Sequence, residues 1–176
     1  MDEQKISSST KKLILIICIG LFAGFLIKLF AFDILFVSGK SMEPAIKDGS
    51  VLAVNKLAYG LAQPYREKLL VQWAAPKKGD VVIFLYNNKT VVKRCIATAG
   101  EKLKYTDSNG YFLEIDNKKI PLSKKQYTNL SGTECVPQGF ILAVGDNYDV
   151  SVDSREYGFV SEKNILGKVI CIPRDF

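Results

Sequence analysis

The sequence predicts a mainly β protein: an antiparallel β domain behind a single N-terminal transmembrane helix. An uncharged apolar stretch over residues 13–27 predicts the helix. Short runs rich in Val, Ile and aromatic residues, separated by turn signals such as Asn-Gly, predict the β domain. The 176 residues suffice for one compact domain beside the helix.

The apolar character of the N-terminal stretch continues to residue 37 and is interrupted only by Lys28 and Asp33. A cleavable signal peptide is the alternative interpretation, but the stretch exceeds the usual signal length and no Ala-x-Ala-like site follows it. A retained anchor is therefore favoured. We expect a cytoplasmic tail over residues 1–12, a transmembrane anchor over 13–37 and an extracytoplasmic domain over 38–176.

The charges that flank the helix bear on its orientation. Lys5, Lys11 and Lys12 precede the helix, whereas Lys40 and Lys47 follow it, and this excess favours a cytoplasmic N-terminus. The net charge of +6 suits an anionic membrane surface. Because the basic residues are scattered and not interleaved with aromatic residues, we expect no nucleic-acid partner.

The remainder of the chain is dominated by strand patterns. The expected strands lie within residues 50–60, 79–86, 89–98, 104–122, 139–147 and 165–173. Asn-Asn, Asn-Gly and Asp-Asn pairs provide turns between or within these segments. Residues 65–74 give the only indication of a helix in this part of the chain.

The composition excludes several kinds of site. The chain contains no histidine, which excludes a Ser-His-Asp or Cys-His arrangement and argues against an ordinary zinc site. Its four cysteines show no Cys-x-x-Cys pairing. Cys95, Cys135 and Cys171 allow one disulfide, but we expect buried free thiols. We expect neither a metal nor a cofactor.

A serine-bearing loop follows the apolar stretch directly, in the sequence "VSGKSMEPAIKDGS" of residues 37–50. Ser41 in this loop is a candidate nucleophile. A serine hydroxyl needs a base to remove its proton, and without histidine the strongest candidate is a buried lysine. The alternative is that Ser41 is an ordinary turn residue, as Ser commonly is between Gly and Pro.

Lys93 is the candidate base because it lies within the apolar strand "TVVKRCIA". Strand alternation places Lys93 on one face with Val91 and Cys95, while Arg94 points to the other face and requires a carboxylate. Burial lowers the pKa of a lysine from its ordinary value of about 10.4, which permits it to act as a base. The alternative is an edge-strand lysine that protects against aggregation.

A third polar stretch, "GDNYDVSVDSREYG", covers residues 145–158. Its start is similar to a calcium-binding EF-hand loop, but Val150 stands where that loop requires Gly and Tyr157 where it requires Glu. A hydrogen-bonded network that orients catalytic groups is a better interpretation. A simple polar turn is the alternative.

Together these stretches resemble the bacterial type I signal peptidases, which are membrane-anchored Ser-Lys endopeptidases. "SGKSMEP" resembles the nucleophile motif of that family, and "KKGDVVIF" followed by "VVKRCIATAGE" resembles its lysine region. "GDNYDVSVDSREYG" resembles its final motif. The motifs occur in the order found in the family, and the resemblance spans nearly all of residues 13–171.

The resemblance implies roles for individual residues. Ser41 would be the nucleophile, Lys93 the general base and Ser151 a hydroxyl that orients Lys93. Met42 would pack beside the site and help to desolvate the lysine. The supporting polar network would comprise Arg94, Asp146, Asp153 and Arg155. The family fold is a mostly β catalytic domain with its site near the membrane surface.

Several positions depart from the family pattern. Some members have a serine that donates to the oxyanion two residues before the nucleophile, whereas this chain has Gly39. Ser38 or a backbone N–H would have to replace that donor, since loss of one such donor costs about 3–4 kcal/mol. Tyr148 and Val150 stand where Arg and Asn are common in the final motif.

The resemblance implies a serine endopeptidase of the bacterial cytoplasmic membrane, single-pass, with its catalytic domain on the extracytoplasmic side. It would remove signal peptides from secretory preproteins that carry small residues at positions −1 and −3. A specialised maturase of the same family, for instance in conjugative transfer, is one alternative. A self-cleaving Ser-Lys repressor-type protease and a non-catalytic membrane-anchored β binding protein are others.

Overall fold

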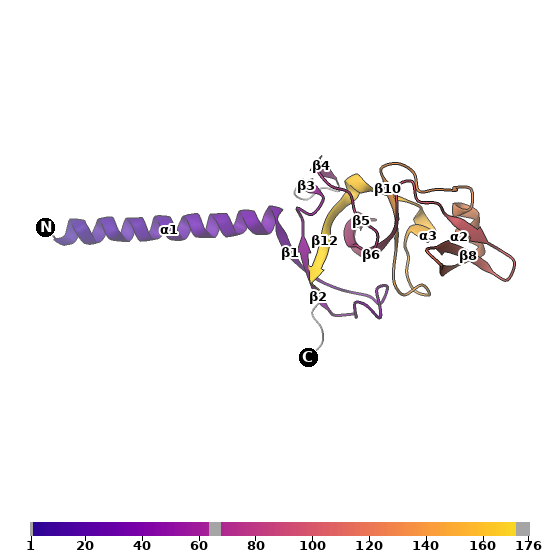
Figure 1. Ribbon diagram of the computed structural model, residues 1–176. Coiled ribbons are helices and arrows are strands. Elements are labelled where there is room, and N and C mark those ends of the chain that lie inside the picture. The colour runs from indigo at the N-terminus through magenta and orange to yellow at the C-terminus, as the bar shows by residue number, and fades with distance from the viewer. Residues whose placement is uncertain (1, 64–67, 172–176) are drawn as a thin grey trace.

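The computed structural model describes residues 2–63 and 68–171, with side chains for residues 9–63 and 68–170. It begins with the long helix α1 (Asp2–Phe30), which projects away from the β domain (Figure 1). Residues Ser9–Phe30 of this helix form a segment long and apolar enough to cross a membrane, and none of it is buried. Twenty-two residues of helix extend about 33 Å, close to the thickness of a bilayer core.

The expected anchor over residues 13–37 is wrong at its C-terminal end. Residues Phe32–Phe36 form the strand β1, which pairs along its full length with β2 (Val51–Asn55). The side chains of β1 alternate between exposed and half-buried, as a strand requires and a membrane helix does not. The helix also begins at Asp2, within the expected tail, so the division of the chain into tail, anchor and domain remains a prediction.

The main sheet contains seven strands in the order β1-β2-β12-β5-β6-β10-β11, and every pairing between them is antiparallel. Its other strands are β5 (Val81–Tyr86), β6 (Lys89–Thr98), β10 (Phe140–Val144), β11 (Val160–Ser161) and β12 (Ile165–Cys171). The predicted mainly antiparallel β fold is therefore confirmed.

Two smaller sheets flank the main one. The first is the hairpin of β3 (Gly60–Ala62) and β4 (Leu69–Gln72). The second contains β7 (Lys104–Thr106), β8 (Tyr111–Ile115) and β9 (Lys118–Leu122). The helices of the domain are the short α2 (Lys124–Leu130), α3 (Ser154–Tyr157) and the 3₁₀ turn η1 (Glu162–Asn164).

The turns explain why the strands lie where the sequence predicts them. Asn87 and Asn88 join β5 to β6 with φ angles of 50° and 59°. Asp116 and Asn117 join β8 to β9 with φ angles of 47° and 64°. Asn and Asp tolerate this left-handed conformation, which matches the twist of a two-residue hairpin. The predicted turns at these two positions are confirmed.

The helix indicated over residues 65–74 is wrong where the structure describes it, because residues 69–72 form β4. Residues 65–67 lie outside the described part of the chain. The strand forms because β4 pairs with β3, and Gly60 permits close contact: a Cβ at this position would collide with the carbonyl of Val71. Leu69 packs against a buried cluster of the main sheet.

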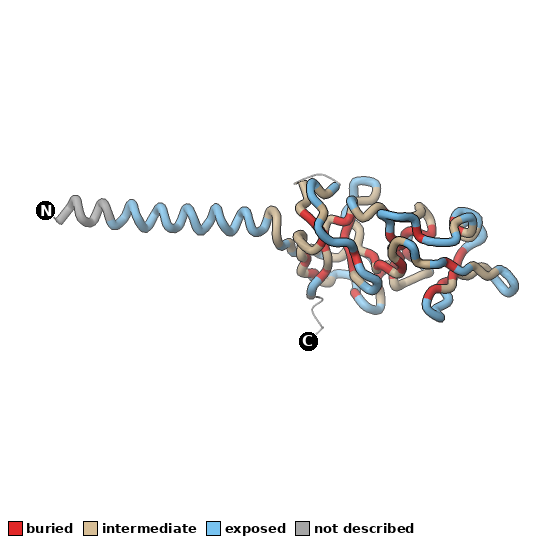
Figure 2. Tube along the Cα trace, turned by 45° about the horizontal axis from the view of Figure 1, so that its top comes forward, coloured by how far each residue is buried: buried red, intermediate tan, exposed pale blue. Residues whose placement is uncertain are grey.

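The core divides into three buried clusters, which lie in the β domain and not along α1 (Figure 2). One of them contains Met42, Ile46, Leu52 and Val54, so the serine-bearing loop is anchored in the core. Of the cysteines whose side chains are described, Cys95 is buried as expected, whereas Cys135 is exposed, and both are free thiols. The Cys171 side chain lies outside the described set.

Candidate active site

The loop between β1 and β2 holds Ser41 in place. Val37 and Ser50 close the loop with a backbone hydrogen bond of 2.8 Å, and the N–H of Ile46 donates to the carbonyl of Met42 at 2.8 Å. Met42 and Ile46 are buried in the core, which fixes the turn that begins at Ser41. The Ser41 side chain is thereby presented on a rigid turn.

Lys93 projects from β6 toward this turn. Its Nζ–H donates a hydrogen bond of 2.9 Å to Oγ of Ser41, which is the contact required of a base and its nucleophile. Alternation along β6 buries Lys93, Cys95 and Ala97 and leaves Arg94 and Ile96 half-buried. The predicted arrangement of the two faces is therefore confirmed, and Lys93 is only 4% exposed.

The surroundings of Lys93 favour its neutral form. Burial lowers the pKa of its ammonium below the ordinary value. The carboxylate of Asp153 partly offsets this effect and raises the pKa, while the nearby Arg155 guanidinium lowers it further. A lysine with a lowered pKa is more often neutral near physiological pH and can then accept the serine proton.

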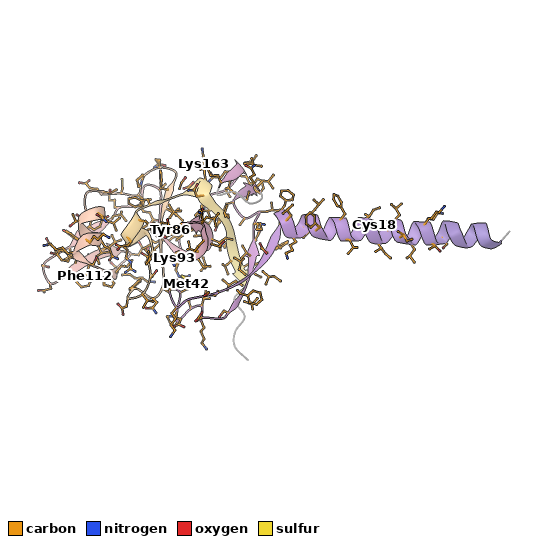
Figure 3. The ribbon with its side chains drawn as sticks, turned by 180° about the vertical axis from the view of Figure 1, so that it is seen from behind. Cys18, Met42, Tyr86, Lys93, Phe112 and Lys163 are labelled. Atoms are coloured by element: carbon orange, nitrogen blue, oxygen red, sulfur yellow. The ribbon has the colours of Figure 1, made fainter. Side chains whose placement is uncertain are left out.

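A cavity of about 140 Å³ opens beside Ser41 and Lys93. It lies between β1 with its following loop and the start of β6, and Met42 lies beside the lysine in its wall (Figure 3). The lining residues are Leu35, Phe36, Val37, Ser38, Gly39, Ser41, Met42, Thr90, Val91, Val92 and Lys93. The wall therefore combines apolar side chains with the polar groups of Ser38, Ser41, Thr90 and Lys93, and the size of the cavity suits a small side chain.

Ser151 lies close to the serine-bearing loop of residues 37–50. A Cβ at Gly145 would collide with both Oγ of Ser151 and the carbonyl of Ser41, so this glycine permits the two segments to approach. The Ser151 hydroxyl is buried and has no hydrogen-bond partner within the described part of the chain. Its expected role in orienting Lys93 remains a prediction.

Arg94 points to the opposite face of β6 from Lys93, where it meets a carboxylate as expected. Its Nε and Nη2 donate to the two carboxylate oxygens of Asp146 at 2.8 and 2.7 Å. The N–H of the next residue, Asn147, donates to the carbonyl of Ser41 at 3.1 Å. The bidentate pair of Arg94 and Asp146 thus connects β6 to the turn that supports the serine-bearing loop.

Asp153 and Arg155 form a second, fully enclosed pair. Both residues are at most 2% exposed, and Arg155 donates to the Asp153 carboxylate at 2.9 and 3.0 Å. Arg155 also donates to the backbone carbonyls of Pro121, Tyr148 and Ser151, and its guanidinium lies 5.4 Å from the ring centre of Tyr148. The pair therefore fixes the turn that holds Ser151.

Removing the Asp153 charge is expected to destabilise the domain. In Asp153→Asn the buried Arg155 loses its counter-charge, and breaking such a pair costs about 3–5 kcal/mol. We expect the thermal midpoint, measured by near-UV circular dichroism in detergent, to fall by roughly 10 °C. Asp149→Asn changes an exposed residue of the same turn and should leave the midpoint unchanged. Equal midpoints for both variants would contradict a structural role of the pair.

As the sequence indicates, Gly39 provides no side-chain donor for an oxyanion. Gly39 has a φ of 111°, and its N–H donates to Oδ1 of Asp48 at 2.8 Å. This N–H is consequently not available to a substrate. Ser38 lines the cavity, and its hydroxyl and the Ser41 N–H remain the candidates for this function.

Cys95 lies on the Lys93 face of β6 but does not compete with Ser41 as a nucleophile. Burial, together with the surrounding carboxylates, raises the pKa of its thiol to about 12. The thiol therefore stays protonated. No group of three or more metal-ligating side chains occurs among the residues that the structure describes.

Three functional positions were not singled out from the sequence. Gly145 permits the close approach of Ser151 to the serine-bearing loop, and the Asn147 backbone N–H donates to the carbonyl of Ser41 in that loop. Tyr148 was noted only as a departure from the family, whereas its ring covers Arg155. For Gly145, the signal available in the sequence was a glycine placed between a buried strand and the polar pair Asp146-Asn147.

Comparisons with known proteins identify relatives of the chain. Residues 10–173 match the family model described as "Signal peptidase, peptidase S26". The chain is 32% identical over 154 residues to signal peptidase IB of Staphylococcus aureus, an alignment that covers 76% of this chain and 73% of the relative. It is 25% identical over 221 residues to signal peptidase I of Buchnera aphidicola, covering 84% and 71% of the two chains.

Among solved structures, the chain is similar to the crystal structure of a signal peptidase I from Enterococcus faecalis. The sequences are 23% identical, the match covers 54% of this chain and 97% of that one, and the TM-score is 0.42. The family assignment rests on the family model and on the Staphylococcus aureus relative, both of which cover most of the chain.

Proposed function

This chain belongs to the signal peptidase family, and we propose that it removes signal peptides from secretory preproteins with Ser41 as nucleophile and Lys93 as general base. Family membership makes it a serine peptidase, so the non-catalytic alternative is set aside. The observation that carries the residue assignment is the 2.9 Å contact between the buried Nζ of Lys93 and Oγ of Ser41.

The proposed reaction proceeds in two stages. Neutral Lys93 takes the proton of Ser41 as Oγ attacks the carbonyl carbon before the scissile bond. The resulting ammonium returns this proton to the leaving amine, which departs as the new N-terminus of the mature protein. Lys93, neutral again, then removes a proton from water as the water attacks the acyl-enzyme, and it passes this proton to Oγ of Ser41 as the ester bond breaks and the signal peptide is released.

The carbonyl oxygen of the tetrahedral intermediate carries a negative charge, which a hydrogen-bond donor has to stabilise. We assign this function to the backbone N–H of Ser41, because the N–H of Gly39 is already bonded to Asp48. The Ser38 hydroxyl, in the wall of the same cavity, is the candidate for a second donor.

The substrate would bind as an extended strand between two free backbone edges. β1 is the outermost strand of the main sheet, and within the described part of the chain it pairs only with β2. In β6, residues 91–93 pair with β5 on one side, whereas the pairing with β10 begins only at Arg94. Both segments line the cavity beside Ser41, so a peptide could add to either edge there.

The small volume of this cavity underlies a preference for small residues at positions −1 and −3 of the preprotein. We expect Ala→Phe at position −1 of an Ala-x-Ala site to reduce cleavage by about 5- to 150-fold, since overpacking costs about 1–3 kcal/mol. Cleavage rates of matched preproteins, separated on gels, provide the measurement. The same substitution at position −2, whose side chain would point out of the cavity, is the control. Equal rates for both substituted preproteins would contradict the assignment of the cavity.

Membrane placement forms part of the proposal. We infer that α1 crosses the cytoplasmic membrane with its N-terminus inside and the β domain outside, supported by the apolar segment Ser9–Phe30 and by Lys5, Lys11 and Lys12 near the N-terminal end of the helix. This places the site close to the surface where preproteins emerge. A specialised maturase of the same family remains the alternative, and it would cleave few general secretory preproteins.

A further inference from the structure

The joint between α1 and the β domain contains a single residue. Helix α1 ends at Phe30 and strand β1 begins at Phe32, so only Ala31 separates them. Phe32 is already paired with Asn55 of β2 in the main sheet. A hinge usually involves a few loop residues that absorb large changes in φ and ψ, and this connection is too short to provide them. The direction of α1 therefore depends on the contacts that hold its last turn.

Lys56, which directly follows β2, holds this last turn against the main sheet. Its backbone N–H donates to the carbonyl of Ala31 at 2.8 Å, and its Nζ–H donates to the carbonyl of Leu29 at 2.7 Å. Nζ also lies 3.9 Å from the carboxylate of Asp33 in β1. The last carbonyls of a helix have no partner within it and carry the negative end of the helix dipole, so an ammonium group is a favourable partner. A single lysine thus connects the end of α1, the joint and β1.

The joint lies beside the path that a membrane-held substrate would take. A cavity of about 640 Å³ between α1 and the β domain is lined by Phe25 and Lys28 from the helix and by Lys56 and Thr90 from the domain. Thr90 also lines the small cavity beside Ser41, so the two cavities adjoin at the start of β6. A preprotein whose signal helix lies next to α1 in the bilayer would therefore pass this joint on its way to Ser41.

We propose that Lys56 is a positioning residue that determines which preproteins are cleaved. By fixing α1 against the β domain, it sets the distance of Ser41 from the membrane. That distance in turn sets the length of the spacer, which we define as the residues of a preprotein between its signal helix and the scissile bond. The inference rests on the proposed function and on the proposed membrane placement of α1, and it adds a basis for substrate choice.

The geometry of an extended substrate makes this selection steep. Each residue of an extended chain advances about 3.3 Å, whereas a displacement of about 1 Å at a reacting group can lower a rate about 100-fold. With a rigid joint, a spacer that is too short or too long brings the wrong bond to Ser41. A contact that only stabilised the fold would act differently, because its loss would lower the cleavage of all substrates equally and leave the preferred spacer unchanged.

The cysteines of the chain permit a direct measurement of the joint. Cys18 is exposed on α1 (Figure 3) and Cys135 is exposed in the β domain, and both are free thiols, whereas Cys95 is buried. Spin labels are attached to Cys18 and Cys135 of the full chain, in which Cys171→Ser removes the remaining thiol. The chain is reconstituted in phospholipid vesicles, and pulsed electron resonance gives the distribution of distances between the two labels.

The distance distribution should be narrow in the unmodified chain and broad in Lys56→Met, whose side chain has a similar length but cannot donate. Cys18 lies about 18 Å from the end of α1, so a swing of about 20°, the average tilt of membrane helices, moves its label by about 6 Å. We expect Lys56→Met to broaden the distribution by about this amount. Lys56→Arg keeps a donor and should stay narrow, as should Lys163→Met, which changes an exposed lysine of η1.

The consequence for substrate choice is measured with preproteins whose spacers differ in single-residue steps, in the same vesicles. For the unmodified chain, we expect cleavage to fall at least about tenfold when the spacer departs by two residues from its best length. For Lys56→Met the fall should be less than about threefold. A short soluble peptide in detergent should be cleaved equally by both chains, because its placement does not depend on the membrane.

Equal distance distributions for the unmodified chain and Lys56→Met would overturn the proposal. An equally steep dependence on the spacer in both chains, or an equal loss of cleavage for every spacer and for the soluble peptide, would overturn the role in substrate choice. If Lys56→Met fails to fold, two glycines inserted between Phe30 and Ala31 separate α1 from the joint while β1 stays paired, and they should broaden the distribution in the same way. Absence of all cleavage by the unmodified chain would overturn the proposed function, whereas the distances test the joint without any cleavage.

Discussion

Ser41→Ala is expected to abolish cleavage of preproteins, with a loss of at least about 10⁴-fold in kcat/KM. The variant retains the turn, because the loop is held by the backbone of Val37 and Ser50 and by the buried side chains of Met42 and Ile46. Only the oxygen that would attack the substrate is lost. The rate is measured with purified protein in detergent against a preprotein that carries an Ala-x-Ala site.

The matched control for this variant is Ser50→Ala, a serine of the same loop whose backbone alone takes part in the described hydrogen bonds. It should cleave at nearly the rate of the unmodified protein. A thermal midpoint of Ser41→Ala equal to that of the unmodified protein would show that the loss is chemical. Substantial activity in Ser41→Ala would instead assign the nucleophile to another group.

Lys93 determines the expected dependence of the rate on pH. The base acts only when it is neutral, and burial lowers the pKa of Lys93 below that of an ordinary lysine. The value of kcat/KM should therefore rise with pH until the lowered pKa is passed and then level off. Below that pKa the ammonium has no free electron pair, and the rate falls about tenfold per pH unit.

Substitutions at position 93 test this explanation. Lys93→Arg should be inactive at every accessible pH, because a guanidinium does not lose its proton in proteins. Lys93→Ala should be inactive as well, whereas Lys89→Ala, which changes an exposed lysine of the same strand, should retain both the rate and the pH profile. A rate that rises only in the range of an ordinary lysine, or that persists in Lys93→Ala, would contradict the role of this residue.

Part of the candidate site could be predicted from the sequence because the required information is local. Strand alternation in β6 places Lys93 inside and Arg94 on the other face, and the structure has this arrangement. Paired Asn and Asp residues mark the turns, since few other residues adopt positive φ angles readily. Because the chain contains no histidine, a buried lysine is the strongest candidate for the base.

Features that depend on distant contacts could not be predicted in this way. Residues 32–36 continue the apolar run of α1, and only their pairing with β2 identifies them as a strand. β4 has the composition of a short helix until its close contact with Gly60 is known. Likewise, the need for glycine at position 145 arises from Ser41 and Ser151, which adjoin it only in the folded chain.

The most direct test of the central claim is the N-terminal sequence of the cleavage product. The full chain in phospholipid vesicles is incubated with a preprotein whose signal peptide ends in Ala-x-Ala, and the mature product is sequenced. A product that begins immediately after the final Ala, and that is missing with Ser41→Ala, is the predicted result. Cleavage at other positions, or an equal yield of product from the Ser41→Ala chain, would contradict the assignment of signal-peptide removal to Ser41 and Lys93.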